Sequence, residues 1–286
     1  MSLTSIHRYP VKSCRGESVE TAYVEPWGLA GDRRWMVVDE DGVAITAREV
    51  NRMVLINPEI TPAGLVVTAP DLPALTVATP DPGVQLPVEL WDSRVTAATV
   101  DGEADAWFSK AIGRPVRLVH FDDPTRRSTS PGFGDADDVV SFADGYPLLL
   151  ATEASLDALN DAIVAASQGA HEPLPMTRFR PNVVVRGAEA WVEDDWRRIR
   201  IGDATFRAVK GCARCVMTTI DPETAEREKE PIASLARIRR WDGATWFAIN
   251  LVPDTVDVTI RVGDEVEVLE AVAPGAGPVR PVKQPR

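Results

Sequence analysis

The residues of this chain best suited to chemistry are two cysteines, Cys212 and Cys215, which stand in a C-x-x-C spacing with Arg214 between them. They belong to the stretch VKGCARCVMTTID, which runs from Val209 to Asp221. A thiolate is the form of cysteine that attacks electrophiles or binds metal, and a neighbouring guanidinium favours it. The stretch therefore predicts a reactive or metal-bound sulfur.

Three chemical interpretations compete with the simpler one, in which both cysteines pack as small hydrophobic side chains. A thioredoxin-like redox pair begins a helix, whereas the β-branched residues within 216–220 favour a strand. A structural zinc site needs four N or S ligands, and beyond the pair the chain offers only Cys14 and three scattered histidines, His7, His120 and His171. The third interpretation is one thiolate that binds a soft transition metal whose other ligands come from a cofactor.

The wider context of the cysteines favours the third interpretation. From Lys210 the chain reads KGCARCVMTTIDPET, and KEP follows a few residues later. This segment resembles the C-S-R-C-I-x-T-T-V-D-P-x-T…K-E-P segment of MOSC-domain molybdenum-cofactor proteins, in particular the mitochondrial amidoxime-reducing components and their bacterial homologues. The resemblance implies that Cys215 is the protein ligand of molybdenum and that Ala213 and Arg214 contact the cofactor. It runs over nearly the whole chain.

Three strings in the N-terminal half extend the resemblance. The string YPVKS carries Lys12 and Ser13, and a G-x-x-x-D-R string ends at Arg33. In the family these positions contact the pterin cofactor, so the resemblance implies the same role here; alone, each would be an ordinary polar turn. A T-A-R string ends at Arg48, which we place near the site rather than in it.

Two strings in the C-terminal half complete the predicted site. The string FADGYPLLL implies a cofactor-binding turn at Asp144, Gly145 and Tyr146, and the string RPN implies contacts from Arg180 and Asn182. Arginine offers a bidentate fork for phosphate, and asparagine offers both a donor and an acceptor to the edge of a heterocycle. A pterin with a phosphate tail presents both groups.

The resemblance also implies an activity. Molybdopterin would bind with the Cys215 thiolate in the molybdenum sphere, and reduced molybdenum would accept oxygen from a small N-hydroxylated substrate such as an amidoxime or hydroxylamine. Asp144 is a second candidate catalytic residue, because a carboxylate near the metal could relay the protons that N–O reduction consumes. Family members with a fused ferredoxin domain continue beyond this point, so we expect a separate ferredoxin-, flavin- or cytochrome-type electron donor. The alternative is a carrier of molybdenum cofactor or persulfide sulfur that turns over no substrate.

Composition excludes several other classes of function. The 31 basic and 43 acidic residues give a net charge of −12, which disfavours nucleic acid and anionic membranes as partners. No apolar run approaches the roughly 18 residues that a membrane-spanning helix needs. An odd number of cysteines and no secretory signal predict a reduced, cytoplasmic protein of bacterial type.

The spacing of apolar residues predicts a mainly β protein with a few helices (α+β). Short β-branched runs separated by proline and glycine are typical of barrels or sandwiches. We expect an N-terminal β-barrel-like domain at 1–119 and a disordered tail at 271–286 rich in Pro, Gly and Ala. The resemblance implies a MOSC β-barrel domain at 120–270, with the cofactor at the junction of the two domains.

Two helices and one long loop stand out in the predicted pattern. Apolar residues spaced on one helical face predict a helix over Asp101–Ile112 that ends at Gly113. A second helix should begin after Thr152, a candidate N-cap. The irregular stretch 122–138 should form the seam between the domains, and we interpret its two arginines, Arg126 and Arg127, as parts of a solvated loop.

Overall fold

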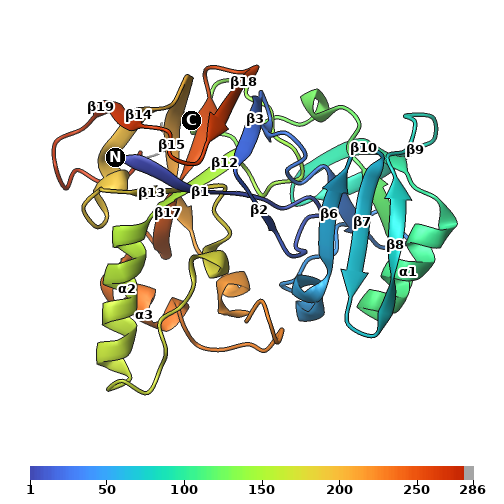
Figure 1. Cartoon of the computed structure of the whole chain (residues 1–286), viewed down its shortest axis with the longest axis horizontal. Helices are drawn as coiled ribbons and strands as arrows, with labels where there is room; N and C mark the ends of the chain where they lie inside the picture. The colour runs from blue at the N-terminus through green and yellow to red at the C-terminus, as the bar shows by residue number, and fades with distance from the viewer. Residues whose placement is uncertain (280–286) are drawn as a thin grey trace, which may run out of the picture.

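The computed structural model describes residues 1–279, which form 19 strands in four sheets and three α-helices: α1 (Gly102–Ile112), α2 (Glu153–Ala166) and α3 (Ile232–Ile238). Figure 1 shows two lobes side by side, with α2 and α3 in one and α1 in the other. The predicted mainly β, α+β class is confirmed.

The larger lobe is built on a nine-stranded sheet in the order β19-β14-β15-β17-β12-β13-β1-β2, with β16 paired to β17. Its strands are β1 (Ser2–Arg8), β2 (Glu17–Val19), β12 (Leu148–Thr152), β13 (Val183–Arg186), β14 (Trp196–Ile201), β15 (Ala204–Ala213), β16 (Arg240–Trp241), β17 (Ala244–Pro253) and β19 (Val266–Ala271). Only β12 and β13 pair in parallel among these neighbours.

Both faces of this sheet are buried, and β12 shows why its sequence is apolar throughout. Side chains alternate between the two faces of a strand. Leu148 and Leu150 face a core shared with a small sheet of β3 (Thr21–Glu25), β4 (Gly28–Leu29) and β18 (Val258–Arg261). Leu149 and Ala151 face a core that includes Leu159 of α2 and residues of α3.

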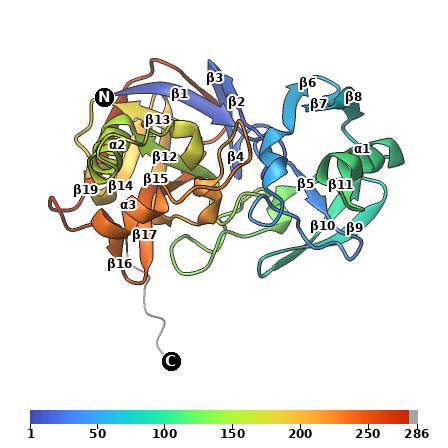
Figure 2. The same cartoon turned by 90° about the horizontal axis from the view of Figure 1, so that it is seen from below.

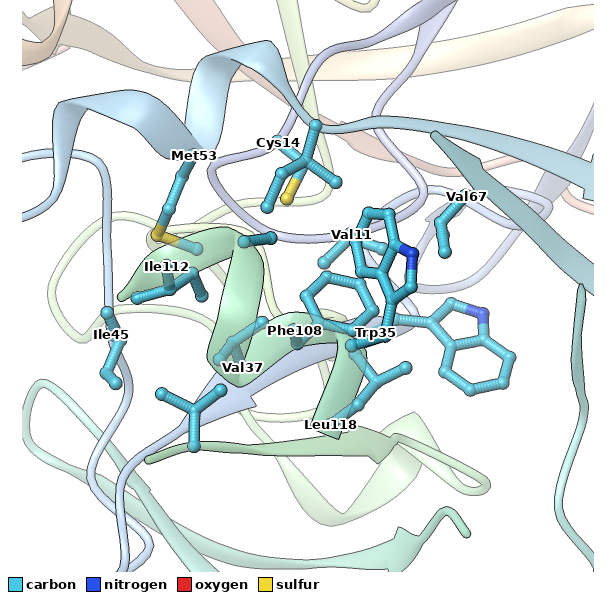
Figure 3. Packing of buried hydrophobic residues seen from close by; sticks show 14 of the residues in the cluster. Val11, Cys14, Trp35, Val37, Ile45, Met53, Val67, Phe108, Ile112 and Leu118 are labelled. Carbon is cyan, nitrogen blue, oxygen red and sulfur yellow. The ribbon is translucent and has the colours of Figure 1, made fainter. Parts of the chain in front are cut away.

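The smaller lobe holds a four-stranded and a three-stranded sheet, with α1 packed against its core. The four-stranded sheet has the order β5 (Trp35–Val38), β11 (Arg117–His120), β10 (Ser93–Thr99), β9 (Gln85–Leu90), and the other has β6 (Asn57–Thr61), β7 (Gly64–Ala69), β8 (Leu72–Ala78). Figure 3 shows Phe108 of α1 among Trp35, Val37 and Leu118. Cys14 is also buried there, and this burial raises the pKa of its thiol to about 12.

The first four strands do not lie with the smaller lobe, which β5 to β11 build. β1 pairs antiparallel with β13 in the large sheet, and β3 pairs with β18 near the C-terminus. The blue N-terminal strand therefore lies among the green, yellow and red elements of the larger lobe in Figures 1 and 2. A division of the chain by its sheets therefore differs from a division by sequence order. The predicted domain boundary near residue 119 stays a proposal.

Local signals in the sequence place both predicted long helices correctly. Asp101 accepts a hydrogen bond from the Ala104 amide as the N-cap of α1, and Gly113 ends the helix in the left-handed conformation that glycine adopts without penalty. Thr152 accepts a hydrogen bond from the Ser155 amide at the start of α2. α3 was not predicted; it follows the charged turn at 226–230, where Glu230 bonds the amide and hydroxyl of Ser234.

Two expectations about local structure are wrong. The β-branched residues after Cys215 form a 3-10 helix, Val216–Thr219, rather than a strand, because Thr218 and Thr219 hydroxyls bond the carbonyls of Cys215 and Val216. The segment 272–279 of the predicted disordered tail packs against the large sheet, because the Asp195 carboxylate accepts hydrogen bonds from the amides of Gly275 and Gly277. Residues 280–286 lie outside the described part of the chain.

No helix among the described residues combines the length and apolarity needed to cross a bilayer.

Candidate functional site

One cavity at the junction of the two lobes brings together all the predicted site residues. It is lined by Lys12, Ser13, Arg33, Asp144, Gly145, Tyr146, Arg180, Asn182, Ala213, Arg214 and Cys215, and also by Arg48, Cys212, Phe179, Met217 and Asn250. Five of the lining side chains are basic, whereas only Asp144 is acidic. The cavity is therefore cationic in a chain whose net charge is −12.

Strand topology explains why distant segments meet here. β1 runs antiparallel to β13, and β12 runs parallel to β13. The segment after β1 and the segments before β12 and β13 therefore lie at the same end of these three strands. The cysteine segment arrives from β15, whose pairing with β17 is interrupted by irregularities between Ala208 and Lys210 and between Gly211 and Ala213. Such bulges redirect a strand near functional sites.

A carboxylate between two cations links the two lobes across the mouth of the cavity. Lys12 Nζ donates to Asp144 Oδ1 at 2.6 Å and to the Phe142 carbonyl at 2.8 Å, and Arg48 Nη2 donates to Asp144 Oδ2 at 2.8 Å. Arg48 therefore belongs to the site itself, not merely to its surroundings. The T-A-R string pointed to this residue, but nothing in the sequence showed which partner it would meet.

The charges around Asp144 decide the protonation of this group. Desolvation in the cleft opposes ionisation, but Lys12 and Arg48 outweigh it and hold the pKa of Asp144 well below its usual range. Desolvation is the largest single effect, but the side chain is 61% exposed and the combined attraction of the surrounding cations exceeds it. Burial lowers the pKa of Lys12 to about 8, even though Asp144 raises it. The proton of this pair therefore belongs to the lysine near neutral pH.

Two predicted arginines stack on one tyrosine. The guanidinium carbons of Arg33 and Arg180 lie 4.5 and 4.1 Å from the ring centre of Tyr9, which fits cation–π contact. Arg180 also donates to the Cys14 carbonyl at 2.7 Å, and Arg33 to the Asp32 carboxylate at 2.6 Å. Burial, together with repulsion from Arg33, lowers the pKa of Arg180 to about 10. An anion in the cavity would relieve this repulsion.

Three of the predicted binding residues have left-handed backbone conformations that are unusual for residues with a side chain. The φ angles are +69° at Ser13, +48° at Arg33 and +55° at Arg180. Each such conformation costs on the order of 1 kcal/mol and persists only where the surrounding structure enforces it. Such strain concentrates at functional sites, and here it occurs in three segments that line one cavity.

Asn182 is buried, and its side chain is occupied by protein groups. Its Oδ1 accepts from Arg33 Nη1 and from the Leu149 amide, both at 3.1 Å, and its Nδ2 donates to the His7 carbonyl at 3.2 Å. These contacts join β1, β12 and the start of β13. The observed contacts of Asn182 therefore orient Arg33, while recognition of a heterocycle by Asn182 stays a prediction.

The turn that carries Asp144 is fixed from behind by the seam loop. Arg127 is only 4% exposed and donates to the carbonyls of Ser141 and Ala143 at 2.5 and 2.6 Å. The expectation that Arg127 lies in a solvated loop is therefore wrong, because the turn's carbonyls need donors in the buried interior. Gly145 packs so closely that a Cβ there would lie 2.4 Å from Ser130 Oγ.

The two cysteines of the pair have different surroundings. Arg214 Nη1 lies 2.8 Å from Cys212 Sγ, and Arg214 Nη2 donates to the Phe179 carbonyl at 2.8 Å. Cys215 is the N-cap residue of the 3-10 helix. Within residues 1–279, no group of three His, Cys, Asp or Glu side chains is arranged to hold a metal ion. The donor set suits a metal that takes one thiolate from the protein and its other ligands from a cofactor.

The cavity also suits the anionic part of such a cofactor. Lys12 is buried and Arg33 and Arg180 are half-buried, and among residues 1–279 their acidic hydrogen-bond partners are Asp32 and Asp144. Arginine and lysine are the usual phosphate-binding side chains. Cations that could bind a phosphate and a cysteine that could bind molybdenum line the same cavity, as molybdopterin with molybdenum would require.

Comparison with known proteins identifies the family. Residues 1–115 match the MOSC N-terminal beta barrel domain, and residues 137–267 match the MOSC domain. The chain belongs to the MOSC-domain family of molybdenum-cofactor-binding proteins, as the sequence strings predicted.

Its relatives fall into two groups. It is 33% identical to mitochondrial amidoxime-reducing component 1 of Xenopus laevis, over 90% of this chain and 79% of that protein. It is 34% identical to mitochondrial amidoxime reducing component 2 of Homo sapiens, over 90% of this chain and 80% of that protein. A molybdenum cofactor sulfurase of Oryza sativa subsp. japonica is 33% identical over 87% of this chain, which spans only 32% of that protein.

Proposed function

We propose that the protein is a molybdenum-dependent reductase of small N-hydroxylated compounds: amidoximes, hydroxylamines and N-hydroxylated bases. The observation that carries the proposal is the cationic cavity that both the Lys12–Asp144 pair and Cys215 line. The relatives named amidoxime-reducing components match over about four fifths of their length. The molybdenum cofactor, when bound, would supply the two-electron chemistry and accept oxygen.

The reaction consumes protons as well as electrons. Reduction of an N–OH group takes two electrons and two protons, breaks the N–O bond, and releases an amine or amidine and water. Asp144 is held ionised, so it is an acceptor rather than the first donor. Lys12 Nζ, with a pKa of about 8 and a 2.6 Å contact to Asp144, holds the proton that this pair would deliver.

The remaining residues would bind and orient the cofactor. Arg33, Arg180 and Lys12 would neutralise its phosphate, Ser13 and the Asp144–Tyr146 turn would orient the pterin, and Ala213 and Arg214 would contact it beside the Cys215 ligand. Electrons would come from a separate ferredoxin-, flavin- or cytochrome-type protein. We further propose that this occurs in the cytoplasm, since all three cysteines are free.

The test is turnover by the loaded protein. Protein purified from a host with ample molybdopterin should contain about one molybdenum per chain and reduce benzamidoxime to benzamidine over many cycles with a chemical reductant. Loaded protein that performs no more than one turnover would contradict the proposal.

A second candidate function is a carrier of the cofactor or of persulfide sulfur. The observation that favours it is the 2.8 Å contact between Arg214 and Cys212, which would stabilise an anionic sulfur there. A match to part of a molybdenum cofactor sulfurase agrees with this function. Mass spectrometry of the intact protein distinguishes it: a carrier would show a mass 32 Da higher on Cys212, together with single-turnover behaviour.

A further inference from the structure

An exposed tryptophan packs against two of the cations that line the cavity. Trp91 occupies the tight turn between β9 and β10 in the smaller lobe, and it is 43% exposed. It is the only exposed tryptophan of the eight in the chain. A large aromatic side chain in water forgoes the stabilisation that burial would give, so its position requires an explanation.

The backbone makes this position more unusual. Trp91 has a φ angle of +55°, in the left-handed region where turns normally place Gly, Asn or Asp. A bulky residue in this conformation is an outlier that costs on the order of 1 kcal/mol. Neither burial nor turn chemistry accounts for tryptophan here.

The contacts of Trp91 connect it with the reacting end of the cavity. The Arg48 guanidinium carbon lies 4.4 Å from the centre of its ring, and Lys12 Nζ lies 5.7 Å from it. Both cations bond the Asp144 carboxylate. The indole is therefore beside the Lys12–Asp144–Arg48 group, with a large part of its surface still open to solvent.

We propose that Trp91 is the specificity-determining residue of the substrate subsite, where it stacks against flat aromatic N-hydroxylated compounds. The inference rests on the proposed reductase function and adds the substrate class. An aromatic ring stacked on the indole places its N–OH substituent toward the Lys12–Asp144 pair. Val216, the residue after Cys215, is 40% exposed and supplies a second apolar side chain near the metal ligand. A small aliphatic substrate has no ring to stack and gains nothing from Trp91.

Binding without turnover tests the inference separately from the activity. Oxidised, molybdenum-loaded protein without an electron donor is titrated calorimetrically with benzamidoxime and with acetamidoxime. The wild type should bind benzamidoxime about tenfold more tightly, the upper end of what one aromatic pair contributes. Trp91→Ala should reduce this preference to less than about threefold, and Trp91→Phe should keep most of it. Tyr23→Ala is the matched control, because Tyr23 is 42% exposed but bonds Asp257 rather than packing against Arg48 and Lys12 of the cavity.

The outcomes distinguish the two proposals. A preference that is absent from the wild type, or that survives in Trp91→Ala, would overturn the role of Trp91. If it survives because both ligands bind equally more weakly to Trp91→Ala, Trp91 only positions Arg48. A Trp91-dependent preference in a protein that fails to reduce benzamidoxime would instead support the subsite and contradict the reductase function. With turnover, Trp91→Ala should raise KM for benzamidoxime about tenfold and should raise KM for acetamidoxime by a much smaller factor.

Discussion

Lys12 Nζ lies 2.6 Å from Asp144 Oδ1, although 132 residues separate the two in the chain. The lysine is almost completely buried, and the carboxylate is open to the mouth of the cavity. The pair therefore joins the buried ammonium group of Lys12 to the solvent-exposed carboxylate of Asp144, at the place where the two lobes meet. Most of the chemistry that we propose depends on this contact.

Asp144→Asn should retain molybdenum and lose most activity. The amide still accepts a hydrogen bond from Lys12 but carries no charge, so it neither receives the proton nor holds Lys12 protonated. General acid–base residues typically contribute a factor of about 10² to 10⁴, and we expect kcat for benzamidoxime to fall at least 100-fold. Metal content is measured beside kcat. A fully loaded variant with undiminished reduction would remove Asp144 from the mechanism.

Substitution of the two cysteines should have unequal effects. Cys215→Ala should lose nearly all bound molybdenum, because the thiolate ligand is gone, whereas Cys212→Ala should retain most of it. Elemental analysis and pterin fluorescence of purified protein measure both. Equal losses in the two variants would contradict the assignment of Cys215 as the single protein ligand. Cys14→Ala, in the core of the smaller lobe, reports any general effect of losing a thiol.

His120 should make the fold sensitive to acid. Burial lowers its pKa to about 4, with a further contribution from Arg34. The unfolded chain takes up this proton near pH 6.5 and the folded chain only near pH 4, so stability falls as pH drops through this window. The loss from this residue amounts to about 3 kcal/mol. In urea unfolding, His120→Phe should lack this loss while keeping the contact with Trp35, whose ring centre lies 4.6 Å away.

Glu193 should have the opposite effect over nearly the same range. Burial raises its pKa to about 7, despite hydrogen bonds from Ser155 and Thr152. The folded chain therefore keeps this proton between pH 4.5 and 7 while the unfolded chain releases it, and stability falls as pH rises. The loss is also about 3 kcal/mol. Glu193→Gln keeps a neutral group, so the same urea series should show a shallower decline toward pH 7. An unchanged slope would mean that Glu193 is ionised in the fold.

The sequence predicts elements whose determinants are local. Asp101 and Gly113 delimit α1 because an N-cap and a left-handed C-cap depend only on nearby backbone. The eleven site residues were found from short strings, and the structure brings all of them to one cavity. What they bind individually stays a prediction.

The sequence does not predict features that depend on distant partners. Arg127 looked like a loop residue because the carbonyls it bonds belong to a turn 14 to 17 residues away. Arg48 looked peripheral because its partner, Asp144, is 96 residues away. The residues after Cys215 favour strands by propensity, but two threonine hydroxyls close a helical turn instead. In each case a hydrogen bond that the sequence does not reveal decides the local structure.

The pairing of β1 with β13 also sets an order of events during synthesis. The first seven strand residues leave the ribosome before any other part of the fold, yet their partner in the sheet begins at Val183. Chains lengthen at about 5–20 residues per second, so β1 is synthesised roughly 10 to 35 seconds before β13. β2 can pair with one edge of β1 soon after synthesis, but the edge that later pairs with β13 lacks its partner during that time, and such an edge invites pairing with other chains. A chaperone that binds the nascent N-terminus would protect the strand that leads to Lys12 and Ser13, two residues that line the cavity.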